Sequence, residues 1–280
     1  MTTGFGTRLR RAMDHHGPLC VGIDPQRRLL EAWGLPYDVT GLERFALTCV
    51  EAFAGAVAAV KPQSAFFAVF GSRGSGVQER GLADLLWAST LTILDAKRGD
   101  IGSTMAGYAA AYLGPEAVSP PDALTVSPYL GYESLRPAID VAQQHGRGLF
   151  VLALTSNPDG ASVQHAVLGG RSVAASIVEG ATVDNSLARE RGELGDIGLV
   201  VGATVGDAVD RLGLDLVTAA TPVLAPGFGA QGGTVADLDL VFGAARPQVL
   251  VASSRAVLGA GPDVVGLADA ARRVADGLRA

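Results

Sequence analysis

The sequence predicts an α/β fold, a (β/α)8 barrel (TIM barrel) that spans residues 1–280 as a single domain. Eight short apolar runs recur along the chain, and each ends in polar residues, glycine or proline. Most runs lack strict alternation, as is typical of parallel strands buried on both faces. Stretches with helical spacing lie between them. An open, doubly wound parallel sheet is the alternative that this pattern leaves.

The predicted elements follow in chain order. The strands are expected at 19–24, 56–63, 91–97, 123–128, 148–156, 197–204, 221–227 and 248–254. Helices are expected where apolar residues recur every three or four positions or where alanine is abundant, at 42–53, 101–112, 172–191 and 267–278. The glycine-rich segment GSRGSG, residues 71–76, is expected to form a flexible turn.

Composition excludes several classes of protein. The net charge of −6 and the pI of about 5.2 argue against a nucleic-acid-binding surface, which needs a basic face. The basic cluster Arg8, Arg10 and Arg11 is interpreted as the solvated face of a first helix, because no signal-peptide core follows it. No run of 18 apolar residues is present to span a membrane. We therefore expect a soluble protein without membrane or nucleic-acid partners.

The two cysteines indicate the cellular setting. Cys20 and Cys49 are too few for a disulfide framework and show no C-x-x-C zinc spacing. They fit a reducing, cytoplasmic environment, and we expect no metal site.

Polar residues end nearly every predicted strand. In a (β/α)8 barrel the carboxyl ends of the strands form the active-site face, so these residues are expected to meet there. In chain order they are Asp24, Lys61, Asp95 with Lys97, Ser127, Ser156, Thr204, the glycine loop after Pro226, and Ser254 with Arg255.

The third strand ends in LDAKRGDIGST, which gathers charges of both signs. Side chains on a strand alternate faces, so Asp95 and Lys97 are expected to point together into the barrel mouth. Asp100 is expected to cap the following helix, with Thr104 one turn later on the same face. The alternative is a structural ion-pair knot of Asp95 with Lys97, in which Arg98 lies in solvent.

The segment GFGAQG, residues 227–232, matches G-x-G-x-x-G after a strand. A dinucleotide-binding fold is rejected, because the loop belongs to the seventh unit and no acidic residue follows about 20 positions later. Glycines at this place are expected to let backbone N–H groups approach a phosphate, as loops after strands 7 and 8 of such barrels often do.

Several segments together carry a resemblance to a known family. DAKRGDIGST (95–104) resembles the D-x-K-x-x-D-I signature of orotidine 5′-phosphate decarboxylases, in particular their longer bacterial group. The other segments that agree in order and spacing are VGIDP (21–25), KPQSAFF (61–67), VSPYLG (126–131), TSNP (155–158), VVGAT (200–204), PGFGAQGG (226–233) and SSR (253–255). They extend over residues 21 to 255.

The resemblance implies decarboxylation of orotidine monophosphate to UMP without a metal or an organic cofactor. Loss of CO2 leaves an anionic carbon, so such an enzyme needs fixed positive charge and a proton donor. Lys97 resembles that donor, and flanking carboxylates favour its ammonium form. In the implied network, Lys61 and Lys97 alternate with Asp95 and Asp100, and Asp95 lies near the substrate carboxylate.

The same resemblance implies roles for residues outside the charged cluster. Asp100 and Thr104 are implied to reach the neighbouring subunit's site, which makes the active form a homodimer. The implied substrate-binding residues are Asp24 at a ribose hydroxyl, Ser156 at the pyrimidine, and, at the phosphate, Gln231 and Arg255 with the backbone near Ser254 and the loop that starts at Pro226.

Two other functions are compatible with such a barrel. A metal-assisted sugar-phosphate decarboxylase shares the D-x-K-x-x-D pattern but would lose activity with a chelator. A non-catalytic nucleotide-binding barrel is the other, although binding alone does not call for the paired charges of Lys61, Asp95, Lys97 and Asp100.

Overall fold

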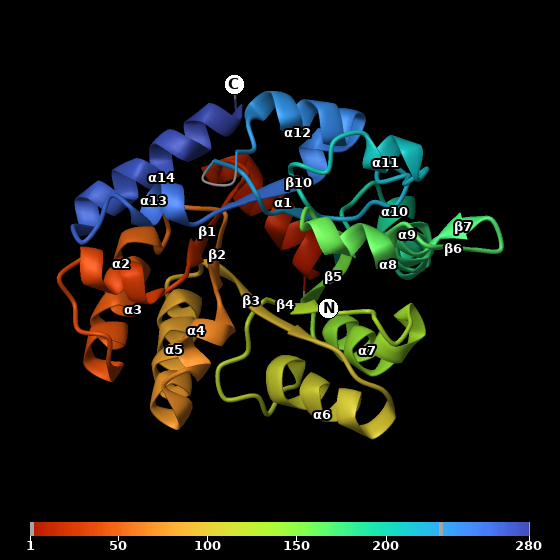
Figure 1. Cartoon of the computed structure of the whole chain (residues 1–280). Helices are drawn as coiled ribbons and strands as arrows, with labels where there is room; N and C mark the ends of the chain where they lie inside the picture. Colours follow the sequence, from red (N-terminus) through yellow and green to blue (C-terminus); the bar gives the residue numbers. More distant parts are fainter. Residues whose placement is uncertain (1–2, 230–231, 280) are drawn as a thin grey trace.

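The computed structural model describes residues 3–229 and 232–279. Eight parallel strands close a barrel in the order β1-β10-β9-β8-β5-β4-β3-β2, and β6 pairs with β7 in a separate antiparallel ribbon (Figure 1). Each predicted strand range overlaps one barrel strand, and only β3 extends beyond its predicted range, by one residue, which confirms the predicted fold. The barrel strands are β1 (Leu19–Ile23), β2 (Ala59–Pro62), β3 (Leu91–Arg98), β4 (Ala123–Val126), β5 (Gly148–Leu154), β8 (Ile197–Val201), β9 (Val223–Ala225) and β10 (Val249–Ser253); the ribbon is β6 (Val167–Leu168) and β7 (Arg171–Ser172).

Helices surround the barrel (Figure 1). Within the described ranges, none combines the length and the apolar character needed to cross a membrane. The predicted helices at 42–53, 101–112 and 267–278 are confirmed. The helices are α1 (Phe5–His16), α2 (Arg27–Ala32), α3 (Val39–Phe53), α4 (Ser64–Ala68), α5 (Gly71–Trp87), α6 (Gly102–Leu113), α7 (Arg136–Gln144), α8 (Ala161–Gln164), α9 (Val173–Asp184), α10 (Ser186–Glu190), α11 (Ala208–Arg211), α12 (Val235–Phe242), α13 (Arg255–Leu258) and α14 (Val264–Arg279).

The prediction of one helix over 172–191 is wrong, because the helix breaks at Asn185. Asn185 is buried, and its side-chain amide donates a hydrogen bond to the Ile197 carbonyl at 2.8 Å. Its side-chain oxygen accepts a hydrogen bond from the Ile197 N–H at 3.1 Å. The break therefore satisfies a buried amide and attaches the end of α9 to the start of β8.

The prediction of a flexible turn over 71–76 is also wrong, because these residues form the first turns of α5. At Gly74, glycine serves close packing instead. A Cβ added at Gly74 would lie 2.0 Å from the Phe67 carbonyl oxygen, so only glycine lets α5 approach α4 this closely. This is a spatial reason for glycine that a local composition argument does not distinguish from flexibility.

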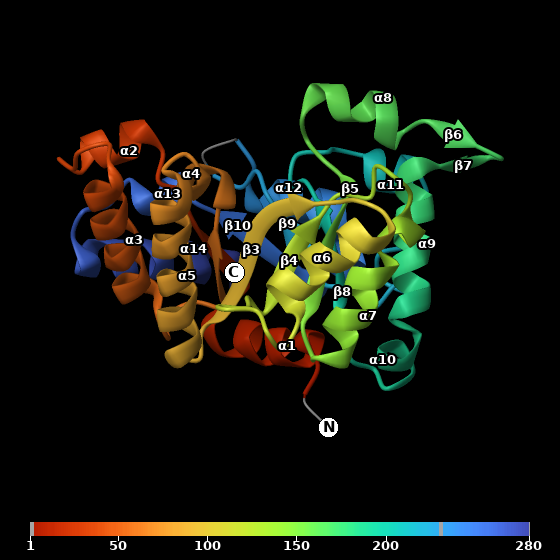
Figure 2. The ribbon, with the colours of Figure 1, turned by 90° about the horizontal axis from the view of Figure 1, so that it is seen from below.

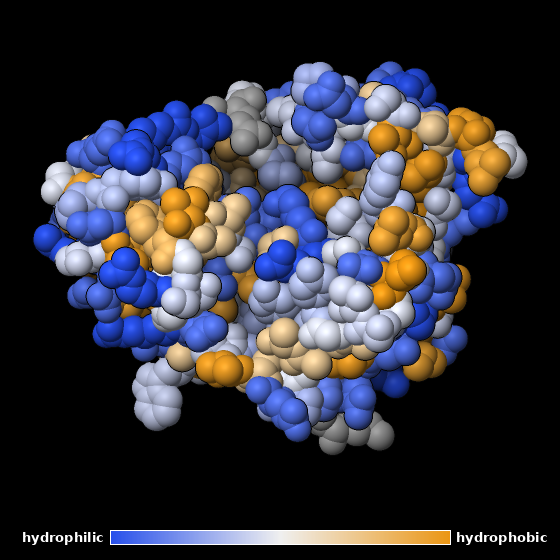
Figure 3. Space-filling model, turned by 60° about the horizontal axis from the view of Figure 1, so that its bottom comes forward, coloured by the Kyte–Doolittle hydropathy of each residue, from blue (hydrophilic) through white to orange (hydrophobic). Residues whose placement is uncertain are grey.

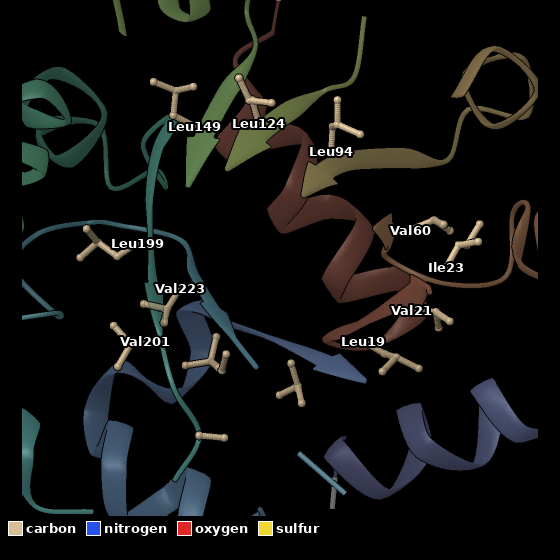
Figure 4. Close-up of a cluster of buried hydrophobic side chains, with 14 of the residues drawn as sticks. Leu19, Val21, Ile23, Val60, Leu94, Leu124, Leu149, Leu199, Val201 and Val223 are labelled. Atoms are coloured by element: carbon tan, nitrogen blue, oxygen red, sulfur yellow. The ribbon is translucent and has the colours of Figure 1, made fainter. Parts of the chain in front are cut away.

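The strand side chains divide into two apolar layers. On β1, Leu19, Val21 and Ile23 belong to the cluster between the barrel and its helices, whereas Cys20 belongs to the cluster inside the barrel. Figure 4 shows the outward side chains of several strands arranged around the ring. Because the side-chain period of a strand is two, a run that is apolar throughout can supply both layers.

Helix α1 closes the amino-terminal end of the barrel (Figure 2). Phe5, Leu9 and Met13, spaced four residues apart on one face, are buried in the cluster inside the barrel. The rings of Phe5 and Phe150 pack edge to face with their centroids 5.8 Å apart. With this end closed, any pocket in the barrel opens at the carboxyl ends of the strands.

Arg8 does not belong to a solvated helix face, so this part of the interpretation of the basic cluster is wrong. Its guanidinium contacts the Asp122 carboxylate and donates a hydrogen bond to the Gly146 carbonyl at 2.9 Å. The same carboxylate accepts a hydrogen bond from the Thr92 N–H at 2.9 Å. Arg8 therefore joins α1 to the segments just before β4 and β5, whereas Arg11 is exposed.

Candidate active site

A pocket of about 410 Å³ lies at the carboxyl end of the barrel, opposite α1. Its volume falls within the range of about 300–1,000 Å³ that is common for ligand pockets. Asp100 and Thr104 do not line it, and Gln231 lies outside the described residues. The predicted site residues that line the pocket together are Asp24, Lys61, Asp95, Lys97, Ser156, Pro226, Ser254 and Arg255.

Asp95 is the centre of the charged cluster. Its Oδ2 accepts a hydrogen bond from Lys61 Nζ at 2.8 Å, and its Oδ1 contacts Lys97 Nζ. The side chains of Lys61 and Asp95 are buried, whereas that of Lys97 is 45% exposed. Asp95 and Lys97 thus point into the pocket together, as predicted. Two ammonium groups against one carboxylate leave this cluster with a single net positive charge.

The cluster stabilises the charged forms of its buried members. Burial alone would raise the pKa of Asp95, but the ammonium groups of Lys61 and Lys97 outweigh it and lower the pKa to about 2. Burial alone would lower the pKa of Lys61, but the carboxylates of Asp95 and Asp24 outweigh it, so this pKa is raised. Asp95 therefore remains a carboxylate and Lys61 an ammonium at neutral pH.

Two uncharged residues complete the surroundings of Asp95. Thr125 Oγ1 donates a hydrogen bond to Asp95 Oδ1 at 3.0 Å. Gln63, with its amide nitrogen toward Asp95, donates to the Asp95 carbonyl oxygen at 2.6 Å and to Oδ2 at 3.2 Å. Neither residue is among those predicted from the sequence. Gln63 stands two positions after Lys61, so strand alternation could have placed the two side chains on one face. No sequence signal of this kind marks Thr125. It lies within the predicted strand 123–128, and the polar residue predicted for the end of that strand was Ser127.

A simple count also marks the site. Lys61 and Lys97 are the only two lysines in the 280 residues, and the other 20 of the 22 basic residues are arginines. Arginine stays protonated under all ordinary conditions, whereas a lysine ammonium can give up its proton. The chain therefore places both of its lysine amines in this one pocket.

The side chains after Lys97 turn away from the pocket. Asp100 does not cap α6 as predicted, because Ile101 occupies the cap position and Asp100 Oδ1 accepts a hydrogen bond from the Ile101 N–H at 2.8 Å. Arg98 does not lie free in solvent either. It donates a hydrogen bond to the Tyr112 hydroxyl at 3.0 Å, and its guanidinium lies 5.2 Å from the Tyr108 ring centroid. Arg98 thereby fixes α6 against β3.

The opposite side of the pocket is formed by the ends of β9, β10 and β1. Ser254 and Arg255 follow β10, and Arg255 makes no ion pair with a described acidic residue. A Cβ at Gly22 would lie 2.0 Å from Ser254 Oγ, so glycine lets the ends of β1 and β10 approach. The loop after Pro226 is held by a hydrogen bond from the Gly233 N–H to the Gly227 carbonyl at 3.0 Å.

The remaining pocket residues offer uncharged or unpaired polar groups. In the described part of the chain, Asp24 Oδ1 is buried without a hydrogen-bond partner. Ser156 follows β5 and lines the pocket, whereas Ser127 and Thr204, the other strand-end candidates, do not. Across residues 3–229 and 232–279, no group of three or more His, Cys, Asp or Glu side chains could hold a metal ion.

The closed barrel and the lysine–aspartate cluster at its carboxyl end define a (β/α)8-barrel protein with a site for a small anionic ligand. A sequence profile of the Orotidine 5'-phosphate decarboxylase / HUMPS family matches residues 17–270. This chain belongs to that family, as the resemblance of its motifs predicts.

Named relatives support the assignment over the full length. The chain is 57% identical over 279 residues to the orotidine 5′-phosphate decarboxylase of Streptomyces coelicolor, covering 98% of this chain and 97% of the relative. It is 56% identical over 277 residues to that of Salinispora arenicola, covering 99% and 97%. A crystal structure of a Streptomyces avermitilis protein assigned to the same activity superposes with a TM-score of 0.94 at 55% identity, covering 99% and 95%.

Proposed function

We propose that this chain converts orotidine 5′-monophosphate into UMP and CO2, with Lys97 as the proton donor. The cluster of Lys61, Asp95 and Lys97 in the pocket carries this proposal. When the bond between the pyrimidine and its carboxylate breaks, the electron pair remains on the ring carbon. Lys97 Nζ transfers a proton to this carbon, and the neutral amine then takes a proton from water.

Besides the proton donor, fixed positive charge in the pocket supports the proposed reaction. The single net positive charge of the cluster is held in place before substrate binds, because Asp95 contacts both lysines. Preorganised positive charge stabilises an anion without reorganisation at the moment of reaction. We assign Asp95 to this positioning role beside the substrate carboxylate, and Lys61 to the support of Asp95.

The nucleotide is proposed to lie across the pocket from this cluster to Arg255. Arginine suits the phosphate, since its planar guanidinium can donate two parallel hydrogen bonds to it. Ser254 and the loop that starts at Pro226 border the same end, and Gln231 is assigned to the phosphate from the family motif alone. The unpaired Asp24 Oδ1 can accept a hydrogen bond from a ribose hydroxyl, and Ser156 can bind the pyrimidine.

The first prediction tests substrate and reaction together. The purified chain is expected to deplete orotidine monophosphate absorbance and release one CO2 per UMP, with the same rate in EDTA. Arg255→Ala is expected to lower kcat/KM for the nucleotide by about 100-fold, since it removes charge-assisted hydrogen bonds, and to change binding of the unphosphorylated nucleoside little. Arg73→Ala, on exposed α5 outside the pocket, is the control and should behave as wild type.

Other outcomes would point elsewhere. Loss of turnover in EDTA would favour the metal-assisted sugar-phosphate decarboxylase, and tight nucleotide binding without turnover would favour the non-catalytic barrel. If Arg255→Ala weakened binding of the nucleotide and of the nucleoside equally, Arg255 would not be the residue that binds the phosphate.

We further propose a homodimer in which Asp100 and Thr104 complete the partner's site. Thr104 is exposed on α6, and Ile101 is 61% exposed beside it. The loop after β4 adds Tyr129 and Leu130, which are 80% and 55% exposed. Figure 3 shows apolar patches around a hydrophilic middle on one face of the molecule. Exposed apolar residues next to two polar side chains that point out of their own pocket are the features expected of a shared interface.

Subunit mixing tests the shared site. Lys97→Ala and Asp100→Ala chains are each expected to be inactive. After they are mixed, unfolded and refolded together, about a quarter of wild-type activity per site should return, because half of the dimers are mixed and each contains one intact site. A mixture of Lys97→Ala with Asp95→Asn is the control. Both residues lie in one chain's cluster, so no activity should return. If no activity returned in either mixture, Asp100 would act in the active site of its own subunit and not in that of the partner.

The remaining proposals concern setting and organisation. We propose that residues 1–280 act as one catalytic domain in the cytoplasm. The two cysteines are free and buried, and burial raises the pKa of the Cys20 thiol to about 12. Such thiols suit a reducing compartment, where no disulfide is required.

A further inference from the structure

Strand β3 widens into a bulge where the site residues lie. Leu94 pairs with Leu124 on β4, and the next pair is Arg98 with Val126. Three residues of β3 therefore face the single residue Thr125. A bulge of this kind interrupts the hydrogen-bond ladder, so the N–H groups of the additional residues need other partners.

The Thr125 hydroxyl supplies those partners. It accepts hydrogen bonds from the Ala96 N–H at 3.0 Å and the Lys97 N–H at 2.9 Å, and it donates one to Asp95 Oδ1 at 3.0 Å. A hydroxyl has one donor hydrogen and two acceptor lone pairs, so its full capacity is used within the bulge. Thr125 is 1% exposed, which leaves these bonds without competition from bulk water.

The same bonds hold Lys97 in an unusual backbone conformation. Its φ of 47° lies in the left-handed region, which residues with a Cβ rarely adopt. The conformation sends the Lys97 side chain back toward Asp95 while Arg98 turns outward to α6. Such conformations persist only where their surroundings hold them, and they cluster at functional sites.

We propose that Thr125 is a positioning residue for proton transfer, whose hydroxyl holds the β3 bulge so that Lys97 and Asp95 enter the pocket side by side. This rests on the proposed function of Lys97 as proton donor. Thr125 acts through the backbone of Lys97 and the carboxylate of Asp95. Without the hydroxyl, two N–H groups of the bulge lose their partner and the Lys97 ammonium leaves its place.

Kinetics of matched variants test the proposal. Thr125→Val removes the hydroxyl at nearly constant size and is expected to lower kcat about 100-fold with little change in KM, because the donor is displaced. Thr125→Ser keeps the hydroxyl and should retain kcat within about threefold. Thr92→Val is the control. Thr92 is equally buried on the neighbouring strand β3, but its hydroxyl donates a hydrogen bond to Asp122 at the far end of the barrel, so kcat should not change.

Two kinetic results would overturn the proposal. One is a Thr125→Val enzyme whose kcat stays within about threefold of wild type, or whose only change is a higher KM, which would make Thr125 a substrate contact. The other is an equal loss of kcat in Thr125→Ser, which would assign the effect to packing.

A second measurement does not depend on activity. Because the chain has two lysines, lysine-specific ¹⁵N labelling yields two backbone amide signals, from Lys61 and Lys97. Hydrogen exchange of the Lys97 amide should accelerate at least about tenfold in Thr125→Val relative to Lys61, and remain as wild type in Thr125→Ser and Thr92→Val. Unchanged Lys97 exchange in Thr125→Val overturns the positioning role. A wild-type chain that does not consume orotidine monophosphate would instead reject the proposed function, and the exchange result would still decide whether Thr125 holds the bulge.

Discussion

Replacing Lys97 with alanine is expected to lower kcat for orotidine monophosphate by about 10⁴-fold or more, while the chain stays folded and still binds UMP. A positioned general acid contributes about 10²–10⁴-fold, and one preorganised electrostatic donor about 10²–10³-fold. Lys97 is proposed to supply both. Its side chain is 45% exposed, so its removal leaves no large cavity in the core. The loss therefore belongs to chemistry rather than to folding.

The measurement compares loss of substrate absorbance with UMP binding by calorimetry in the same preparations. Arg27→Ala is the control, because it also removes one cation near the barrel mouth but does not line the pocket. Its kcat should stay within about twofold of wild type. A Lys97→Ala enzyme with wild-type turnover would remove Lys97 from the role of proton donor, and one that no longer binds UMP would give it a role in ground-state binding.

The second large effect is expected from Asp95→Asn, which should destabilise the fold by about 3–5 kcal/mol at neutral pH as well as abolish activity. Breaking a buried ion pair leaves its partner charged and uncompensated, which is the reason for this magnitude. Here the partner is Lys61, whose ammonium is buried and bonded to Asp95 at 2.8 Å. Urea unfolding monitored by circular dichroism measures the difference.

The pH dependence of this loss has a definite sign. In the wild type, Asp95 raises the pKa of Lys61 above its ordinary value, so this contribution to stability is present below pH 10.5 and declines as the pH rises further. In Asp95→Asn, burial of Lys61 dominates and lowers its pKa, so the unfolded chain binds the proton more tightly. The variant should therefore recover part of its stability relative to wild type between pH 7 and about pH 10.

In acid, the wild type is expected to lose the stability that Asp95 contributes. The pKa of Asp95 is lowered from 3.8 to about 2, so its contribution to stability is complete above pH 3.8 and is lost as the pH falls through about 2. Asp84→Asn is the matched control, since the Asp84 side chain is 48% exposed and lies 4.0 Å from Arg80. It should change stability by less than about 1 kcal/mol. Equal stability of Asp95→Asn and wild type at pH 7 would show that the buried pair contributes nothing.

Elements with strong local patterns could be predicted from the sequence. The run Leu91–Leu94 is apolar and ends in charges, which is enough to predict a buried strand with an exposed end. The helix at 172–191 was predicted too long for a similar local reason, since nothing near Asn185 in the chain shows that its amide bonds Ile197, twelve residues later. The segment 71–76 was misread as a flexible turn, because the close packing that requires glycine at Gly74 and flexibility favour the same residue.

The site could be predicted in its charged members but not in their uncharged supports. Lys61, Asp95 and Lys97 stand at strand ends, and strand alternation is enough to predict that Asp95 and Lys97 share a face, although in the folded chain the β3 bulge and the left-handed backbone of Lys97 bring them together. Thr125 stands 30 residues from Asp95 and has no charge to mark it. Asp100 was assigned to a helix cap because aspartate favours that position, but Ile101 takes it in the folded chain.

The sequence by itself determined the recurrence of eight strands, the family, and the presence of two lysines and a carboxylate at strand ends. These features follow from the spacing, order and charge of residues, which are local properties of the chain. Tertiary structure alone decided that α1 closes one end of the barrel, that Arg98 turns outward, and that Thr125 holds the bulge that presents Lys97. Each of these depends on contacts between segments far apart in the chain, and such contacts exist only once the barrel has closed.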